Sequence, residues 1–262
     1  MILKRLRPWE NNRQRDLLRG VFHIDDAQAK RRLLRWFEKY DIVETKYPEH
    51  RMLVRMLIRF PDLMAKTTLL PRLNGLKRQM WARAQMNLKA SEAVLAKLTE
   101  FDIPWVLIGS AVWFLRPDFR FREELDVVEI CVPDAARSTA SHLLQQIGWR
   151  LDWSAPENAV VNNHFALSKG NGARIRLSKP STLFLRTATP TAEVNQLFDR
   201  AGGPAPDAVI QSIMIGRSAP IFSPSDQWVF DYFNLLEAGS LDIDNPKLPQ
   251  HTQQFLKKNF VV

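Results

Sequence analysis

The stretches WVLIGSAVWFL (residues 105–115) and ELDVVEICV (124–132) decide the fold class of this chain. The first predicts a short apolar strand that ends at Gly109-Ser110 and leads directly into a helix, because small residues separate two apolar runs. The second predicts a strand at 125–132, since this run is rich in β-branched residues. A helix at 135–147 follows and ends at a glycine. This alternation is typical of an α/β core.

The segments that follow add strands and then become irregular. Apolar runs near 164–168 and 173–177 predict two further strands, and Gly170-Asn171-Gly172 between them predicts a hairpin turn. Prolines divide the rest of the chain, where the clearest expected helix starts at residues 223–226, has an apolar stripe from Trp228 to Leu236 and ends at Gly239.

The N-terminal part of the chain predicts helices instead. Residues 27–40 place their apolar side chains on one helical face, and Asp25 or Asp26 is expected to cap this helix. Residues 51–60 repeat the pattern between two prolines, and a third helix is expected at about 73–100, either continuous or interrupted.

We therefore expect an α+β protein with three regions. A basic helical region covers residues 1–90, a small mixed-sheet core covers 91–180, and a partly helical region covers 181–262.

Charge is unevenly distributed along the sequence. The net charge is +9, but residues 1–90 hold 21 Lys and Arg against 9 Asp and Glu, and the remainder is net acidic. This asymmetry predicts an acidic partner for the first region, either nucleic acid, nucleotide, a membrane surface or an acidic protein. Arg51, Arg55 and Arg59 form a stripe that fits a nucleic-acid groove, or else a solvated helix face that contacts acidic neighbours of the same protein.

The composition limits the expected cellular location of the protein and the chemistry of its single cysteine. Cys131 is the only cysteine, which excludes an intrachain disulfide and a cysteine zinc cluster, and its apolar surroundings predict a buried residue. The sequence has no apolar run long enough for a membrane span and no secretory signal, so we expect a cytoplasmic protein.

The order strand, Gly109-Ser110, helix, then the acidic pair Glu124 and Asp126 resembles the DNA polymerase beta-like nucleotidyltransferase superfamily. Within that superfamily, the layout is most similar to a bacterial uncharacterised nucleotidyltransferase family, with its helical N-terminal part, α/β core and helical tail. The motif covers residues 90–180 and the layout covers the whole chain. An unrelated α/β domain with an exposed Glu124 beside a capping Asp126 is the alternative.

The resemblance implies an NTP site. Gly109 and Ser110 would bind a triphosphate at a helix N-terminus. Carboxylates at Glu124 and Asp126 would bind Mg²⁺, because alternate residues of a strand share a face and hard cations prefer oxygen ligands. Two such ions would stabilise the attacking and leaving oxygens of an in-line displacement.

The family's third carboxylate is replaced in this sequence. The matching strand reads Arg174-Ile175-Arg176, and an arginine cannot bind Mg²⁺. Either arginine is then expected to bind nucleotide phosphate directly, or the fold serves as a degenerate binding or scaffold module.

Three functions follow as expectations. The chain transfers a nucleoside monophosphate from an NTP to an acceptor, or binds a nucleic-acid or protein partner through residues 1–90 without catalysis, or is a structural subunit of a larger assembly.

Overall fold

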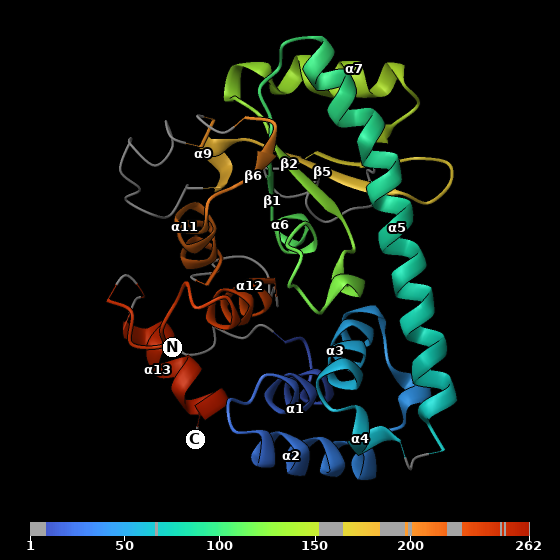
Figure 1. Cartoon of the computed structure of the whole chain (residues 1–262), viewed down its shortest axis with the longest axis vertical. Helices are drawn as coiled ribbons and strands as arrows, with labels where there is room; N and C mark the ends of the chain where they lie inside the picture. The colour runs from blue at the N-terminus through green and yellow to red at the C-terminus, as the bar shows by residue number, and fades with distance from the viewer. Residues whose placement is uncertain are drawn as a thin grey trace. The chain divides into compact units, whose positions relative to one another are not determined.

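The computed structural model describes residues 9–65, 68–151, 165–183, 197–198, 201–218, 227–246, 248 and 250–261. The chain forms two compact units, one made of Met1–Met80 with Arg217–Val262 and the other of Trp81–Gly216. The architecture is α+β, with a helical N-terminal region, a six-stranded mixed sheet in the middle and helices at the C-terminus (Figure 1). This part of the expected fold class is confirmed, whereas the division at residues 90 and 180 stays a prediction.

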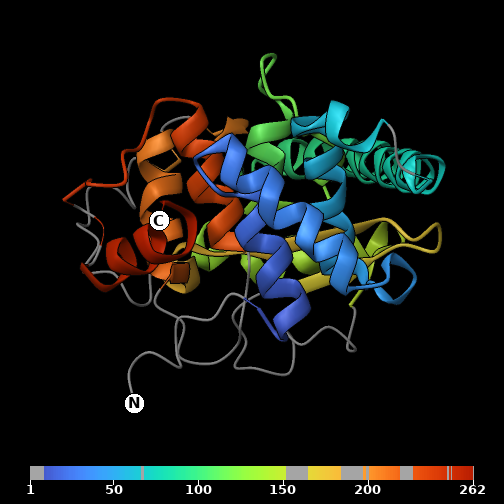
Figure 2. The same cartoon turned by 90° about the horizontal axis from the view of Figure 1, so that it is seen from below.

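The regular elements described in the first unit are all helices. Its elements are α1 (Asn12–Val21), α2 (Asp26–Lys39), η2 (Ile42–Glu44), α3 (Tyr47–Arg59), α4 (Pro61–Met64), the first part of α5 (Leu70–Glu100), α12 (Gln227–Glu237), α13 (Gln250–Leu256) and η5 (Lys257–Val261). Helices α1 and α2 pack side by side, as Figures 1 and 2 both show.

Two expected helices, α2 and α5, are confirmed with small shifts at their ends. Asp25 caps α2, because its side chain accepts a hydrogen bond from the backbone N–H of Gln28 at 2.7 Å. The helix expected at 73–100 is continuous and begins slightly earlier, at Leu70. The expected start of α12 at 223–226 lies outside the described residues.

The arginine stripe on α3 is largely an interior feature, so the nucleic-acid groove is wrong, whereas the expected contacts with acidic neighbours of the same protein are present. Arg51 is only 7% exposed and Arg55 only 1%. The Arg55 guanidinium donates to Asn234 Oδ1 at 2.9 Å, pairs with Glu237 at 3.2 Å and lies over the ring of Phe22. Burial of an arginine is tolerated when its donors and its planar face both have partners. Arg51 and Arg55 therefore pack α3 against α12, while Arg59 donates hydrogen bonds to the carbonyls of Val21 and His23.

The second unit contains the sheet. Its strands are β1 (Val106–Ile108), β2 (Val128–Cys131), β3 (Arg150–Leu151), β4 (Phe165–Ser168), β5 (Arg174–Ser178) and β6 (Gly203–Pro204). The strand order is β3-β4-β5-β2-β1-β6. Strand β2 pairs antiparallel with β1 and parallel with β5, and the expected hairpin between β4 and β5 is confirmed.

Strand β2 begins three residues later than the sequence predicts, at Val128. The 3₁₀-helix η3 (Arg122–Glu124) comes first, and the buried Asn87 of α5 binds the chain between the two elements. Its amide nitrogen donates to the carbonyl of Asp126 at 2.6 Å, while its oxygen accepts from the backbone N–H of Arg174 at 3.0 Å. The side chain of Asn87 therefore occupies the carbonyl of Asp126 and the N–H of Arg174, two backbone groups that would otherwise be free to extend the pairing of β2 and β5.

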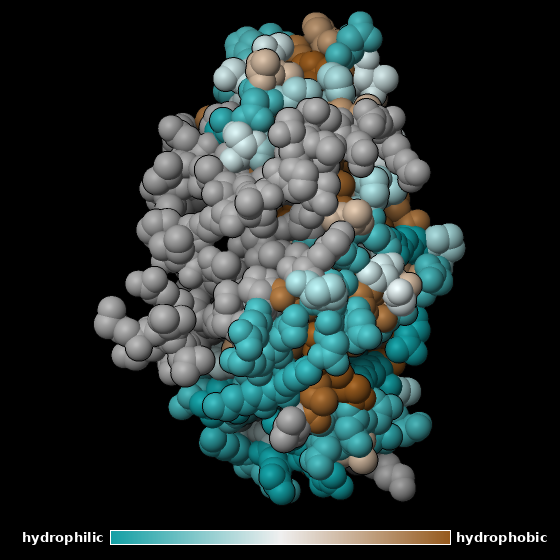
Figure 3. Space-filling view, turned by 90° about the vertical axis from the view of Figure 1, so that its left-hand side faces the viewer, coloured by the Kyte–Doolittle hydropathy of each residue, from teal (hydrophilic) through white to brown (hydrophobic). Residues whose placement is uncertain are grey.

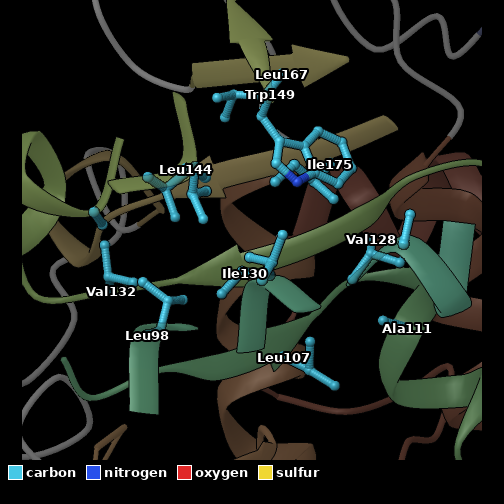
Figure 4. Packing of buried hydrophobic residues seen from close by; sticks show 14 of the residues in the cluster. Leu98, Leu107, Ala111, Val128, Ile130, Val132, Leu144, Trp149, Leu167 and Ile175 are labelled. Atoms are coloured by element: carbon cyan, nitrogen blue, oxygen red, sulfur yellow. The ribbon is translucent and has the colours of Figure 1, made fainter. Parts of the chain in front are cut away.

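One face of the sheet carries the apolar core of this unit. Val128, Ile130 and Val132 point into the same cluster as Leu98 of α5 and Leu144 of α7 (Arg137–Gln146), as Figure 4 shows. Since side chains alternate along a strand, Glu129 and Cys131 face the other side. The remaining described helices of this unit are α6 (Ser110–Phe114), η4 (Asp134–Ala136), α9 (Pro180–Leu183) and α11 (Asp207–Ser218), whose end enters the first unit.

No helix in the described part of the chain combines the length and the apolarity that a bilayer crossing requires.

Replacement of Arg55 by alanine tests the interior stripe. We expect the free energy of unfolding to fall by about 2–4 kcal/mol, because the change opens space between aromatic rings and leaves the buried Asn234 without its donor. Arg31→Ala is the matched control, since Arg31 is exposed on α2, and it should stay within about 0.5 kcal/mol. Urea unfolding followed by tryptophan fluorescence measures both, and equal effects would contradict the structural role.

Candidate functional site

The turn after β1 has the conformation that the motif requires. Gly109 has a φ of 63°, which is in the region that favours glycine, and Ser110 begins α6. Helix α6 is only one turn long, so few backbone N–H groups and little helix dipole are available for a triphosphate. The Val112 N–H is bonded to the Gly109 carbonyl at 3.1 Å.

A carboxylate lies against this turn, and it belongs to Glu129. A Cβ added to Gly109 would lie 3.0 Å from Glu129 Oε2. The reason is the register of the sheet, since Ile108 of β1 pairs directly with Glu129 of β2. Glu129 is 2% exposed, so the glycine makes room for a buried charged group.

The Glu129 carboxylate has two partners on β5. Ser178 Oγ donates to Glu129 Oε1 at 2.9 Å, and Arg176 Nη1 lies 3.6 Å from Glu129 Oε2. Glu129 and Arg176 are direct cross-strand neighbours of the parallel β2–β5 pair. Because a buried carboxylate without a counter-charge is very costly, this arginine stabilises the centre of the sheet.

The described contacts of Asp126 are with helix α5 and not with the Gly109 turn. Its Oδ1 is 3.4 Å from Arg83 Nε of α5 and makes no hydrogen bond, and its carbonyl accepts from Asn87. Asp126 thus contacts α5, on the side of the sheet where the apolar core lies, whereas Glu129 is on the opposite side. The structure does not bring these two carboxylates together.

The other predicted site residues lie on the same elements. Glu124 ends η3, and its side chain is outside the described structure. Arg174 begins β5, where it pairs with Ser168 of β4. Among the predicted residues whose side chains the structure describes, Gly109, Ser110 and Arg176 therefore lie at the Glu129 carboxylate or at the turn beside it.

Sequence reasoning missed Glu129 although a signal was present. A glutamate inside the apolar run Val127–Val132 predicts a buried carboxylate, which needs a cation from a neighbouring strand. The alternating Arg174-Ile175-Arg176 segment supplies that cation. Only the register between β2 and β5 shows which arginine it is.

The described donor set does not fit Mg²⁺. Two of the described carboxylates near the motif, Asp126 and Glu129, already lie beside arginines, which repel a divalent cation. No group of three His, Cys, Asp or Glu side chains with metal-ligand geometry occurs among the residues that the structure describes. We therefore derive no step through a metal ion.

Cys131 is fully buried on β2, as its sequence context predicts. Burial raises the pKa of its thiol well above the ordinary value, and the charges of Glu129 and Asp134 raise the pKa further. A thiol that stays protonated is a poor nucleophile. Cys131 is therefore a packing residue of the sheet.

Comparisons of the chain with protein-family models, with characterised proteins and with solved structures gave no match in any of the three.

Substitution of Gly109 by alanine tests the close approach at the turn. We expect a loss of about 1–3 kcal/mol in the free energy of unfolding, because the new Cβ adopts a strained φ and meets Glu129. Gly75→Ala is the control, since nothing lies within 4 Å of its added Cβ and it sits within α5. That change should stabilise the protein by about 0.5–1 kcal/mol. Urea titrations measure the free energy of unfolding of both variants. An unchanged value for Gly109→Ala would contradict the close packing of Gly109 against Glu129.

Proposed function

We propose that this chain is a binding module built on a nucleotidyltransferase-like core that no longer catalyses, and that its N-terminal unit binds an acidic partner. The main observation behind this proposal is the ion pair between Glu129 and Arg176. A guanidinium beside the carboxylate of the Gly109 turn supplies the positive charge that a metal ion would otherwise provide.

The resemblance to the family supports the core assignment. The chain runs from β1 through Gly109-Ser110 into α6 and then to β2, which is the order that the motif requires. Arginine remains charged at every working pH and has no lone pair for a metal. A site organised around Arg176 is therefore suited to a structural role or to binding an anion, and not to catalysis with two metal ions.

The alternative is Mg²⁺-dependent transfer of a nucleoside monophosphate from an NTP. In that case Gly109 and Ser110 would bind the triphosphate, Glu124 and Asp126 the metal, and Arg174 or Arg176 a phosphate. The strand–turn–helix order favours it, whereas the Arg83 contact of Asp126 counts against it.

Calorimetry distinguishes the two functions. For the full chain titrated with ATP, we expect no heat that depends on Mg²⁺, and no label transferred from α-labelled NTPs to protein, RNA or small acceptors. Asp126→Ala serves as the comparison variant. Mg²⁺-dependent binding or labelling that this variant loses would overturn the proposal in favour of the enzyme.

Replacement of Arg176 by aspartate tests whether the arginine occupies the place of a cation. The variant should lose about 3–5 kcal/mol of unfolding free energy in EDTA, because two carboxylates then face each other across β2 and β5. Mg²⁺ or Ca²⁺ should restore part of the melting temperature, since ligand binding to the folded state stabilises it. Arg174→Asp, on the same strand, is the matched control and should show no response to cations. An equal response of both variants would argue against the assignment.

A further inference from the structure

The exposed face of α2 carries several cations of the first unit. Lys30, Arg31 and Arg35 are exposed on it. The bottom of Figure 3, at the height of α2 in Figure 1, is mainly hydrophilic.

Most neighbouring cations of this unit are already paired within it. Arg13 pairs with Glu44 and Glu49, and Arg59 with Asp26. Arg15 and Lys39 both contact Asp16. These carboxylates are therefore unavailable to neutralise the outer face of α2.

Arg31 and Arg35 differ from these residues. Neither makes an ion pair with any residue that the structure describes, although Arg31 interacts electrostatically with Asp25 and the exposed Glu38 follows Arg35 by three residues. They are four residues apart on one helical face, where like charges repel and destabilise the helix. An anionic partner would remove that repulsion, so the arrangement is more favourable in a complex than in the free chain.

The surface has too little apolar area for a protein interface. Its exposed apolar side chains are Leu34, at 47% exposure, and Ile24, at 45%. Ile24 precedes α2 and Leu34 lies in its second half, and charged residues lie between them in the sequence. The centre of a protein interface is apolar and poor in charged residues. Contacts with phosphate groups need only cations at the surface.

We propose that the exposed face of α2 binds the phosphate backbone of a nucleic acid, with Arg31 and Arg35 as its principal contacts. This inference rests on the proposed function and names the class of its acidic partner. Guanidinium groups fit phosphate oxygens in a bidentate manner, which suits arginine at both positions. No base-reading arrangement is required, so we expect binding with little sequence preference.

Fluorescence anisotropy with labelled duplex DNA, duplex RNA and single-stranded RNA of about 20 nucleotides tests the proposal, with salt varied from about 50 to 200 mM. The full chain should bind with an affinity that falls steeply as salt rises, because neutralised phosphates release counterions. For duplex DNA, the double variant Arg31→Gln/Arg35→Gln should reduce the slope of log affinity against log salt by about 1.8.

The matched control is Lys257→Gln/Lys258→Gln, which removes the same charge from exposed positions of the same unit. This variant should bind as the parent chain does. The α2 variant should melt at a temperature no lower than the parent, since it removes a repulsion and breaks no ion pair among the described residues, which separates lost binding from lost folding.

The outcomes separate the two proposals. Equal salt slopes for both double variants would overturn the assignment to α2 and leave the binding function intact. Association with poly-glutamate or anionic lipid vesicles, but with none of the nucleic acids, would overturn the nucleic-acid inference alone. Absence of salt-sensitive association with any of these polyanions would overturn the proposed binding function as well.

Discussion

The buried carboxylate of Glu129 is the constraint on which the centre of the second unit depends. A carboxylate in an apolar sheet is stable only with a counter-charge and hydrogen-bond donors, and β5 supplies both through Arg176 and Ser178. The same group requires a glycine at position 109. Three strands are thus coupled through one side chain, and β1, β2 and β5 are adjacent in the sheet.

The element order could be predicted from the sequence because its signals are local. Apolar runs, glycine breaks and the 3.6-residue period located β1, β2, the β4–β5 hairpin, α2 and α5 with small boundary shifts. The start of β2 was wrong because a residue from a distant helix, Asn87, binds the preceding loop. No local pattern contains that information.

The candidate site was less predictable for a similar reason. Spacing along the chain suggested that Glu124 and Asp126 approach the Gly109 turn, but cross-strand register brings Glu129 there. Register depends on how the strands pair, and a shift of one residue exchanges the two faces. Likewise, the sequence pattern around Arg51 and Arg55 is that of surface residues, but both guanidinium groups lie over the ring of Phe230 from the C-terminal helix α12.

The first unit is assembled from both ends of the chain, Met1–Met80 and Arg217–Val262. During synthesis the N-terminal helices therefore leave the ribosome before their partners in α12 exist. The contacts of Arg55 with Asn234 and of Phe22 with Phe233 can form only after the whole second unit has been translated. At typical elongation rates that delay lasts on the order of ten seconds, during which apolar surface is open to chaperones. The second unit, being continuous in the chain, is able to fold first.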